Sequence, residues 1–207
     1  MIGIVNYGAG NIFSLTSALE RQGLNYGMVH TEADLDKYTH IIIPGVGHAA
    51  AAMKKLEQTG LVAPIKALKK PVLGICVGMQ LLTDHSEEGD ARLTGIFPLN
   101  TRLFDKNQGI KIPHMGWNNI EHKNNPLFDG VANDTQFYFV HSYFIEYNPI
   151  FDIATANYGE PFSAAIQKDN LRRSVPPRKI WECRRTDIKE FFKLKTIKCT
   201  LFLLLIF

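Results

Sequence analysis

The order of hydrophobic and polar residues divides the first half of the chain into short apolar runs and longer amphipathic segments. Apolar runs bounded by turn residues predict buried strands, and they occupy residues 2–6, 26–30, 40–43 and 71–75. Between them, apolar residues recur with the spacing of a helix at residues 12–22, 48–58 and 62–69. Strands that are apolar throughout and alternate with helices predict an α/β fold, in which a mostly parallel sheet carries helices on both faces.

From residue 94 onward the pattern changes, because strand-like segments follow one another with turns between them and little helix. These segments cover residues 93–104, 109–120, 135–147, 152–159 and 162–167. We expect them to form an antiparallel or mixed extension of the sheet. After about Asn170 the sequence has neither a clear periodicity nor a strand to close the fold. We therefore assign residues 1–170 to one domain and residues 171–207 to a tail that is not a domain.

The bulk composition is typical of a soluble globular protein with one full hydrophobic core. The chain has 207 residues, of which 45% are hydrophobic and 21% are charged. Three cysteines (Cys76, Cys183 and Cys199) do not make a disulfide framework, and the N-terminus has no signal-peptide pattern, so we expect a cytoplasmic protein. The longest apolar run, at residues 201–207, is shorter than the ~20 residues of a membrane span, which argues against a membrane protein.

The net charge of +3 is distributed unevenly along the chain. Residues 171–207 hold 10 Lys and Arg against 3 Asp and Glu, whereas residues 1–170 hold 13 against 17. A basic arm that binds nucleic acid is one explanation of such a tail. We favour another explanation, given below, and expect no nucleic-acid partner.

The sequence GICVG at residues 74–78 places Cys76 between a predicted strand and a predicted helix. In parallel α/β sheets, ligands bind at such turns, at the carboxyl ends of the strands. The two glycines permit the crowded backbone of a nucleophile turn, and we expect the helix N-terminus to lower the pKa of Cys76. The N–H of Val77 would face a developing oxyanion, and the glycine turn at Gly45–Gly47 could supply a second donor. The alternative is that Cys76 is a small buried hydrophobic residue, as most free cysteines are.

Five stretches of the sequence resemble one enzyme family, in order and without large gaps, over about residues 1–170. They are MIGIVNYGAGN, HIIIPGVGHAAAAM, PVLGICVGMQLL, IPHMGWNNI and FYFVHSYF. Together they resemble the class I (triad) glutamine amidotransferases, and in particular the amidotransferase subunit of imidazole glycerol phosphate synthase. The resemblance implies a flavodoxin-like α/β fold of the class I glutamine amidotransferase type, with L-glutamine as the substrate and neither a cofactor nor a metal.

In this family a cysteine attacks the side-chain amide of glutamine, forms a glutamyl thioester and releases ammonia. The ammonia passes through a (β/α)8-barrel cyclase partner to a ribulosyl phosphate intermediate of histidine biosynthesis. The resemblance therefore implies a heterodimer, in which the turn at residues 7–11 faces the partner, and it makes Cys76 the nucleophile. The other implied site residues are Gly45, Val46, Gly47 and Val77 for the oxyanion, and Gln80, Ser142 and Tyr143 along the glutamine pocket. His114 and Trp117 resemble pocket-edge residues of the family, and packing and turn roles are equal alternatives for these two.

Two other segments contain residues that could carry chemistry, but a plainer interpretation is favoured for each. The glycine-rich turn at residues 7–11 could hold a phosphate at a helix N-terminus. It lacks a full dinucleotide fingerprint, so we interpret it as an ordinary turn between a strand and a helix. Asp84, His85, Glu87 and Glu88 include enough ligands for a metal, yet the cluster is typical of a solvated loop.

A cysteine amidase needs a histidine base that is oriented by a carboxylate. The family supplies both from one stretch near the C-terminus, typically Gly-Val-x-Phe-His-Pro-Glu-Lys-Ser. In this chain the last histidine is His141, and residues 174–181 have the sequence SVPPRKIW where the motif belongs. The catalytic His and Glu are therefore absent from the chain as written, and we expect its activity to be severely impaired.

A shift of the reading frame accounts for this absence. Codons for Val175 to Glu182 can be chosen so that dropping the first base gives Phe-His-Pro-Glu-Lys-Ser-Gly, which is the missing motif. The same frame permits a helical segment up to Lys193 and a stop codon at Leu194 and Lys195. A frameshift near Asn170 would thus have replaced the last strand, the His-Glu pair and the final helix, and it explains the basic tail. The alternative is an evolved basic tail on a degenerate subunit.

Three other functions remain open from the sequence. A different cysteine hydrolase of the same fold, such as a γ-glutamyl hydrolase or a protease-like relative, would need its own histidine near Cys76. A non-catalytic subunit that only docks on the cyclase would be compatible with the missing base. A paralogue that supplies ammonia for the amidination of surface sugars would have an almost identical sequence.

Overall fold

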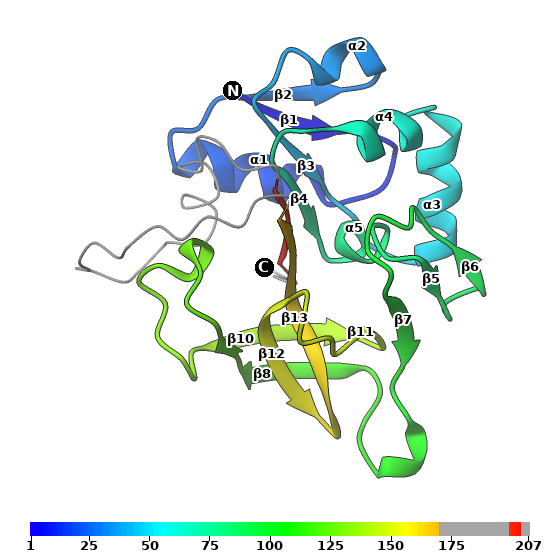
Figure 1. Cartoon of the computed structure of the whole chain (residues 1–207), viewed down its shortest axis with the longest axis vertical. Coiled ribbons are helices and arrows are strands. Elements are labelled where there is room, and N and C mark those ends of the chain that lie inside the picture. The colour runs from blue at the N-terminus through cyan, green and yellow to red at the C-terminus, as the bar shows by residue number, and fades with distance from the viewer. Residues whose placement is uncertain (170–198, 204–207) are drawn as a thin grey trace.

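The computed structural model describes residues 1–169 and 199–203, and its N-terminal half alternates strands with helices (Figure 1). The strands are β1 (Ile2–Val5), β2 (Tyr26–Val29), β3 (His40–Ile43) and β4 (Val72–Ile75). The helices are α1 (Ile12–Arg21), α2 (Glu32–Leu35), α3 (Ala49–Gln58), α4 (Val62–Ala67) and α5 (Val77–Gln80). The strands pair in parallel in the order β2-β1-β3-β4, with α1 on one side and α3 on the other, which confirms the predicted α/β fold.

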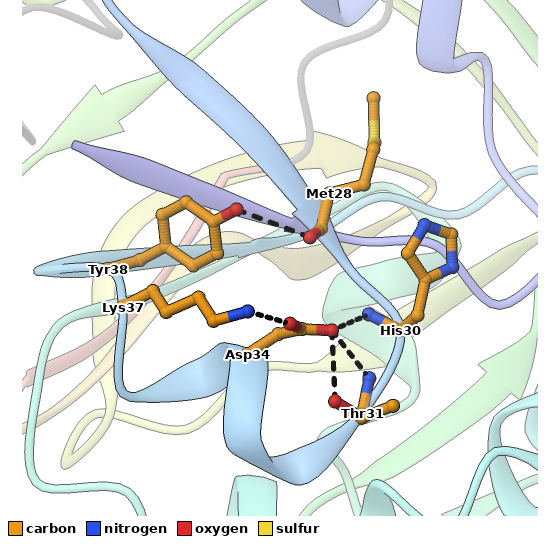
Figure 2. Close-up of polar contacts among 6 residues, drawn as sticks. All are labelled: Met28, His30, Thr31, Asp34, Lys37 and Tyr38. Carbon is orange, nitrogen blue, oxygen red and sulfur yellow. Dashed lines mark hydrogen bonds and ion pairs between the residues drawn. The ribbon is translucent and has the colours of Figure 1, made fainter.

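Helix α2 was not predicted, because four residues are too few to show a helical period. It is held by its Asp34, whose carboxylate accepts hydrogen bonds from the backbone N–H groups of His30 and Thr31 and lies 2.7 Å from Nζ of Lys37 (Figure 2). Lys37 first, and then these N–H groups, hold the pKa of Asp34 well below its usual range. The hydroxyl of Tyr38 donates to the carbonyl oxygen of Met28, so the connection from β2 to β3 is fixed at both ends.

The second half of the described structure is built from strands. They are β5 (His85–Ser86), β6 (Ala91–Arg92), β7 (Asn100–Leu103), β8 (His114–Asn119), β9 (Glu121–His122), β10 (Gln136–His141), β11 (Tyr143–Glu146), β12 (Asp152–Tyr158) and β13 (Glu160–Asp169). Two short 3-10 helices interrupt them at Lys106–Gln108 and Pro126–Phe128. β7, β11, β12 and β13 extend the main sheet by antiparallel pairing, as predicted. β8 and β10 instead form a separate two-stranded antiparallel sheet, so the expectation that these two segments extend the main sheet is wrong.

The main sheet is closed by a strand that the sequence pattern did not predict. Residues Cys199–Leu203 form β14, which pairs in parallel with β4 and antiparallel with β13 (Figure 1). Leu201 is paired with Leu73 on one side and with Gln167 on the other. The expectation that no strand closes the fold is therefore wrong, because β14 occupies the position between the parallel and antiparallel parts of the sheet. The expected loss of the final helix falls outside the described residues.

The hydrophobic core explains why the two halves pack as one unit. Ile4, Ile41, Ile42 and Ile43 are fully buried in β1 and β3, as expected of strands covered on both faces. In the second half the core is aromatic, and Phe104 stacks on Phe144 with ring centroids 4.4 Å apart. Burying each such side chain contributes about 1.5–3 kcal/mol to stability. Among the described helices, none is both long enough and apolar enough to cross a bilayer.

Candidate active site

Cys76 occupies a sharp turn between β4 and α5. Its backbone has φ 54° and ψ −120°, a conformation that L-residues with a side chain rarely adopt and that costs about 1–3 kcal/mol. The turn is held from both ends, because β4 is paired with β3 and β14 and because the N–H of Met79 donates to the carbonyl oxygen of Cys76 at 2.8 Å. The surrounding structure therefore holds Cys76 in this strained backbone conformation, as happens at many functional sites.

Two glycines let a second turn approach this one. A Cβ atom at Gly78 would overlap the carbonyl oxygen of Ile43, and a Cβ atom at Gly45 would overlap the backbone nitrogen of Gly78. Only glycine fits at either position, so the end of β3 lies directly against the first turn of α5. Gly47 has φ 85°, which also favours glycine. The segment Gly45–Gly47 is thereby brought beside Cys76, as the sequence predicted.

The two turns open into a cavity of about 530 Å³. Its wall contains all eight residues that the sequence analysis placed at the catalytic and substrate-binding site: Gly45, Val46, Gly47, Cys76, Val77, Gln80, Ser142 and Tyr143. The wall also contains Asn11 and Ser14 from the start of α1, Pro113 before β8, and Glu88 and His141. Segments from both halves of the fold therefore meet at one site.

The cavity has a small number of polar groups. Gln80 is only 5% exposed, and its Nε2 donates to the carbonyl oxygen of Tyr143 at 3.5 Å, whereas its Oε1 has no hydrogen-bond partner within the described part of the chain. Glu88 Oε2 accepts a hydrogen bond from the N–H of Ala49, the first residue of α3, at 2.6 Å. The sequence analysis assigned Glu88 to a solvated loop, and nothing in the local sequence distinguishes it from its acidic neighbours.

The electrostatic environment of Cys76 differs from the sequence prediction. Burial raises the pKa of its thiol, and the negative charge of Glu88 raises it further, while the N–H of Val77 acts in the opposite direction. The expected net lowering of this pKa is wrong, because desolvation outweighs the N–H of Val77 at the start of α5, a helix of four residues. A thiol in this setting needs a base to become a nucleophile.

Comparison with known proteins identifies the family. The family described as glutamine amidotransferase class-I matches residues 3–175 of the chain. The chain belongs to this family. Imidazole glycerol phosphate synthase subunit HisH 2 of Legionella pneumophila (strain Lens) is 39% identical over 172 residues, which are 83% of this chain and 86% of that protein. The HisH subunit of Bacteroides fragilis (strain YCH46) is 40% identical over 195 residues, which are 93% of this chain and 99% of that protein.

Solved structures agree with this family in their fold. A crystal structure of a glutamine amidotransferase gives a TM-score of 0.58 over 77% of this chain and 85% of that chain, at 14% identity. PurLQS from Thermotoga maritima gives a TM-score of 0.57 over 80% of each chain, at 20% identity. The amidotransferase is thus an enzyme subunit by family, with the class I fold.

The turn at residues 7–11 supports the site of the amidotransferase from behind. The hydroxyl of Tyr7 donates to the carbonyl oxygen of Pro44 at 2.6 Å, next to Gly45. Burial, and then the nearby Cys76, raise the pKa of Tyr7 far above its ordinary value. Gly10 has φ 113° and lies so close to Pro44 that a Cβ atom would be 2.9 Å from its side chain. The turn therefore packs against Pro44, which directly precedes the Gly45–Gly47 segment.

The histidines of the amidotransferase leave Cys76 without an obvious base. Of the seven histidines, all within the described residues, only His141 lines the cavity. Both of its ring nitrogens are engaged, Nδ1 with the carbonyl oxygen of Tyr143 at 2.9 Å and Nε2 with Nδ1 of His114 at 3.0 Å. His114 is buried behind it, and Trp117, which is 68% exposed, points to solvent, so neither lies in the cavity wall where a pocket edge was expected.

The acidic loop considered as a metal site has other partners. His85 pairs with Asp90 at 2.8 Å, and Glu87 accepts from the N–H of Leu103 at 2.7 Å. Within the described residues, no group of three or more His, Cys, Asp or Glu side chains is arranged to hold a metal ion.

Proposed function

We propose that the chain is by descent the glutamine amidotransferase subunit of an imidazole glycerol phosphate synthase, a type of subunit that hydrolyses L-glutamine and delivers ammonia to a cyclase in histidine biosynthesis. We propose further that the chain as written is inactive, because the His-Glu pair of the family is missing. The observation that carries the proposal is the cavity in which Cys76 meets the Gly45–Gly47 turn, Gln80 and the Ser142–Tyr143 segment. Relatives at about 40% identity over most of the chain carry the name of this subunit, which supports the same choice.

The geometry supports a thioester mechanism. The thiolate of Cys76 attacks the side-chain amide carbon of glutamine, and the carbonyl oxygen becomes an oxyanion. Val77 and the Gly45–Gly47 segment line the same cavity as Cys76, and their backbone N–H groups would donate hydrogen bonds to that oxyanion. The C–N bond then breaks, the leaving nitrogen takes a proton to become ammonia, and water hydrolyses the glutamyl thioester to glutamate.

The cavity has the properties expected for L-glutamine. Its volume of about 530 Å³ is suited to a small molecule. The unpartnered Oε1 of Gln80 can accept a hydrogen bond from the substrate, which would satisfy a buried acceptor. The carboxylate of Glu88 is a negative group in the wall that suits the α-ammonium group of an amino acid.

The chain as written lacks the base for this chemistry, and we attribute the loss to a frameshift near Asn170. The sequence has no histidine after His141, and His141 uses both ring nitrogens in hydrogen bonds. Losing one member of a nucleophile–base pair reduces the rate by about 10⁴–10⁶. The lack of a base favours a second candidate, a non-catalytic subunit that docks on the cyclase.

The proposed partner is a (β/α)8-barrel cyclase, bound as a heterodimer in the cytoplasm. Co-expression of the tagged chain with the cyclase of the same genome, followed by affinity capture, tests this proposal. Capture of the cyclase without glutaminase activity supports both the amidotransferase subunit with a lost base and the non-catalytic docking subunit. Recovery of activity when the sequence from Val175 onward is restored to the family motif supports the lost base. Failure to capture the cyclase, together with glutaminase activity of the chain alone, would instead favour another cysteine hydrolase. A cyclase from a surface-sugar gene cluster as the captured partner would favour the paralogous pathway.

A further inference from the structure

Two buried histidines form a hydrogen-bonded relay, with His141 in the cavity wall and His114 behind it. Nδ1 of His141 lies 2.9 Å from the carbonyl oxygen of Tyr143, and its Nε2 lies 3.0 Å from Nδ1 of His114. Beyond His114, Nδ2 of Asn118 lies 3.4 Å from Nε2 of the ring and 2.8 Å from the carbonyl oxygen of Asn157. The relay therefore runs from Asn118 on β8 to Tyr143 at the start of β11.

The partners determine which nitrogen carries each proton. A carbonyl oxygen only accepts, so Nδ1–H of His141 donates to Tyr143, and Nε2 of the neutral ring is an acceptor. Nδ1–H of His114 then donates to His141, and Nε2 of His114 accepts from the amide of Asn118. Burial lowers the pKa of both rings to about 4, so both are neutral at pH 7. All hydrogen bonds of the relay therefore point in one direction, toward the cavity.

Aromatic packing keeps both rings in this orientation. His114 is 3% exposed and lies between Tyr158 and Phe139, with ring centroids 3.9 and 5.1 Å away and the planes nearly parallel. His141 is 7% exposed and packs against Phe162 with a centroid distance of 5.1 Å. Packing therefore fixes the plane of each ring, and the hydrogen bonds fix which way round it lies, because a flip would put carbon atoms in the places of the bonded nitrogens.

The relay ends on an oxygen that ties the cavity wall together. The carbonyl oxygen of Tyr143 also accepts from Nε2 of Gln80 at 3.5 Å. Ser142 is the one residue between β10 and β11, where the backbone leaves the two-stranded sheet and enters the main sheet. We propose that His114 and His141 are positioning residues, which hold the Ser142–Tyr143 segment and Gln80 in the arrangement that binds L-glutamine. This inference rests on the proposed function, because it takes L-glutamine as the ligand.

Replacing His141 with asparagine or with glutamine distinguishes a role in hydrogen bonding from a role in packing alone. The amide nitrogen of asparagine takes the place of Nδ1 of histidine, and that of glutamine takes the place of Nε2. His141→Asn therefore keeps the donor to Tyr143, whereas His141→Gln removes it. Titration calorimetry of the full-length chain with L-glutamine should give a Kd within about twofold of wild type for His141→Asn and about 5- to 10-fold weaker for His141→Gln.

The same two substitutions at His114, and a control substitution at a histidine far from the cavity, complete the test. His114→Asn should bind L-glutamine more tightly than His114→Gln, because only the asparagine keeps a donor to His141. His122→Gln alters a histidine on β9 whose ring nitrogens face the carbonyl oxygens of Lys123 and Val131, away from the cavity, and should leave the Kd unchanged. If packing alone mattered, glutamine, the closer match in size, would be tolerated at least as well as asparagine, and that result would overturn the proposal.

Nitrogen NMR of the imidazoles provides a readout that packing does not affect. In the wild-type chain at pH 7, both His114 and His141 should be neutral and protonated at Nδ1. Protonation at Nε2 in either ring would overturn the relay, whatever the affinity for glutamine. Absence of L-glutamine binding by the wild-type chain would overturn the proposed function and this role with it. Wild-type binding with equal Kd values for His141→Asn and His141→Gln would overturn the positioning role alone.

Discussion

Residues that end a predicted strand or belong to a family motif could be placed in the cavity from the sequence, whereas Glu88, which has neither signal, could not. Cys76 and Val77 share a motif, and Gly45–Gly47 follows a neighbouring strand, so the carboxyl edge of a parallel sheet brings them together. Glu88 reaches the same cavity from a loop beyond α5, and no local pattern marks it. The pKa of Cys76 was mispredicted for a similar reason, since it depends on burial, which is a property of the folded chain.

A substitution at Glu88 tests the environment of Cys76. Because the charge of Glu88 raises the pKa of the thiol, after burial as the main cause, Glu88→Gln should lower that pKa. Alkylation of Cys76 by iodoacetamide at pH 7 should then be about 2- to 5-fold faster, because a larger fraction of the thiol is present as thiolate. The measurement uses a background with Cys183→Ser and Cys199→Ser. Glu87→Gln is the matched control, and equal acceleration by both variants would contradict the assignment.

Among the strands and helices, local periodicity was sufficient to predict an element wherever the spacing of its own apolar residues determines which face is buried. All four strands and the three longer helices of the parallel half lie where the apolar spacing predicted them. The separation of β8 and β10 from the main sheet was not predictable, because tertiary contacts determine which strands pair and the local sequence does not show these contacts. β14 was missed because its position depends on two strands far away in the sequence, whose backbone groups it pairs with on both sides.

Truncation tests the role of β14. Removing residues 199–207 leaves β4 and β13 without the strand they share, exposing unpaired backbone groups on both. We expect a lower melting temperature and aggregation in size-exclusion chromatography. Removing only residues 204–207 keeps β14 and serves as the control. If the shorter chain were monomeric and melted at the same temperature as the control, β14 would contribute nothing to the fold.

At the scale of the whole molecule, the site is assembled between two halves with different architectures. The parallel half supplies Cys76, the Gly45–Gly47 turn and Gln80, and the antiparallel half supplies the segment from His141 to Tyr143. β14 joins the two halves in one sheet. The sequence predicted each half separately, but it could not predict this junction, because the strand that makes it comes from the segment without a readable pattern.

A buried acid in the antiparallel half gives the molecule a measurable pH dependence. Asp152 is 1% exposed, and burial raises its pKa to about 6, so the folded state binds a proton more tightly than the unfolded state. Its contribution to stability is present below the unfolded pKa of about 3.9 and is lost as the pH rises through 6. Asp152→Asn should therefore stabilise the protein at pH 7, by at most about 3 kcal/mol, and change it little at pH 4. Equal effects at both pH values in denaturant unfolding would contradict this pKa.

We infer that the chain has a glutaminase site whose base was lost with the reading frame. The most direct measurement is glutaminase activity, with the cyclase and its ligand present, of the chain as written and of a version in which the sequence from Val175 onward is restored to Phe-His-Pro-Glu-Lys-Ser-Gly. The account predicts no measurable activity for the chain as written, recovery in the restored chain, and loss again when Cys76→Ala is added to it. Substantial activity of the unrestored chain would contradict the account, because another residue would then deprotonate Cys76.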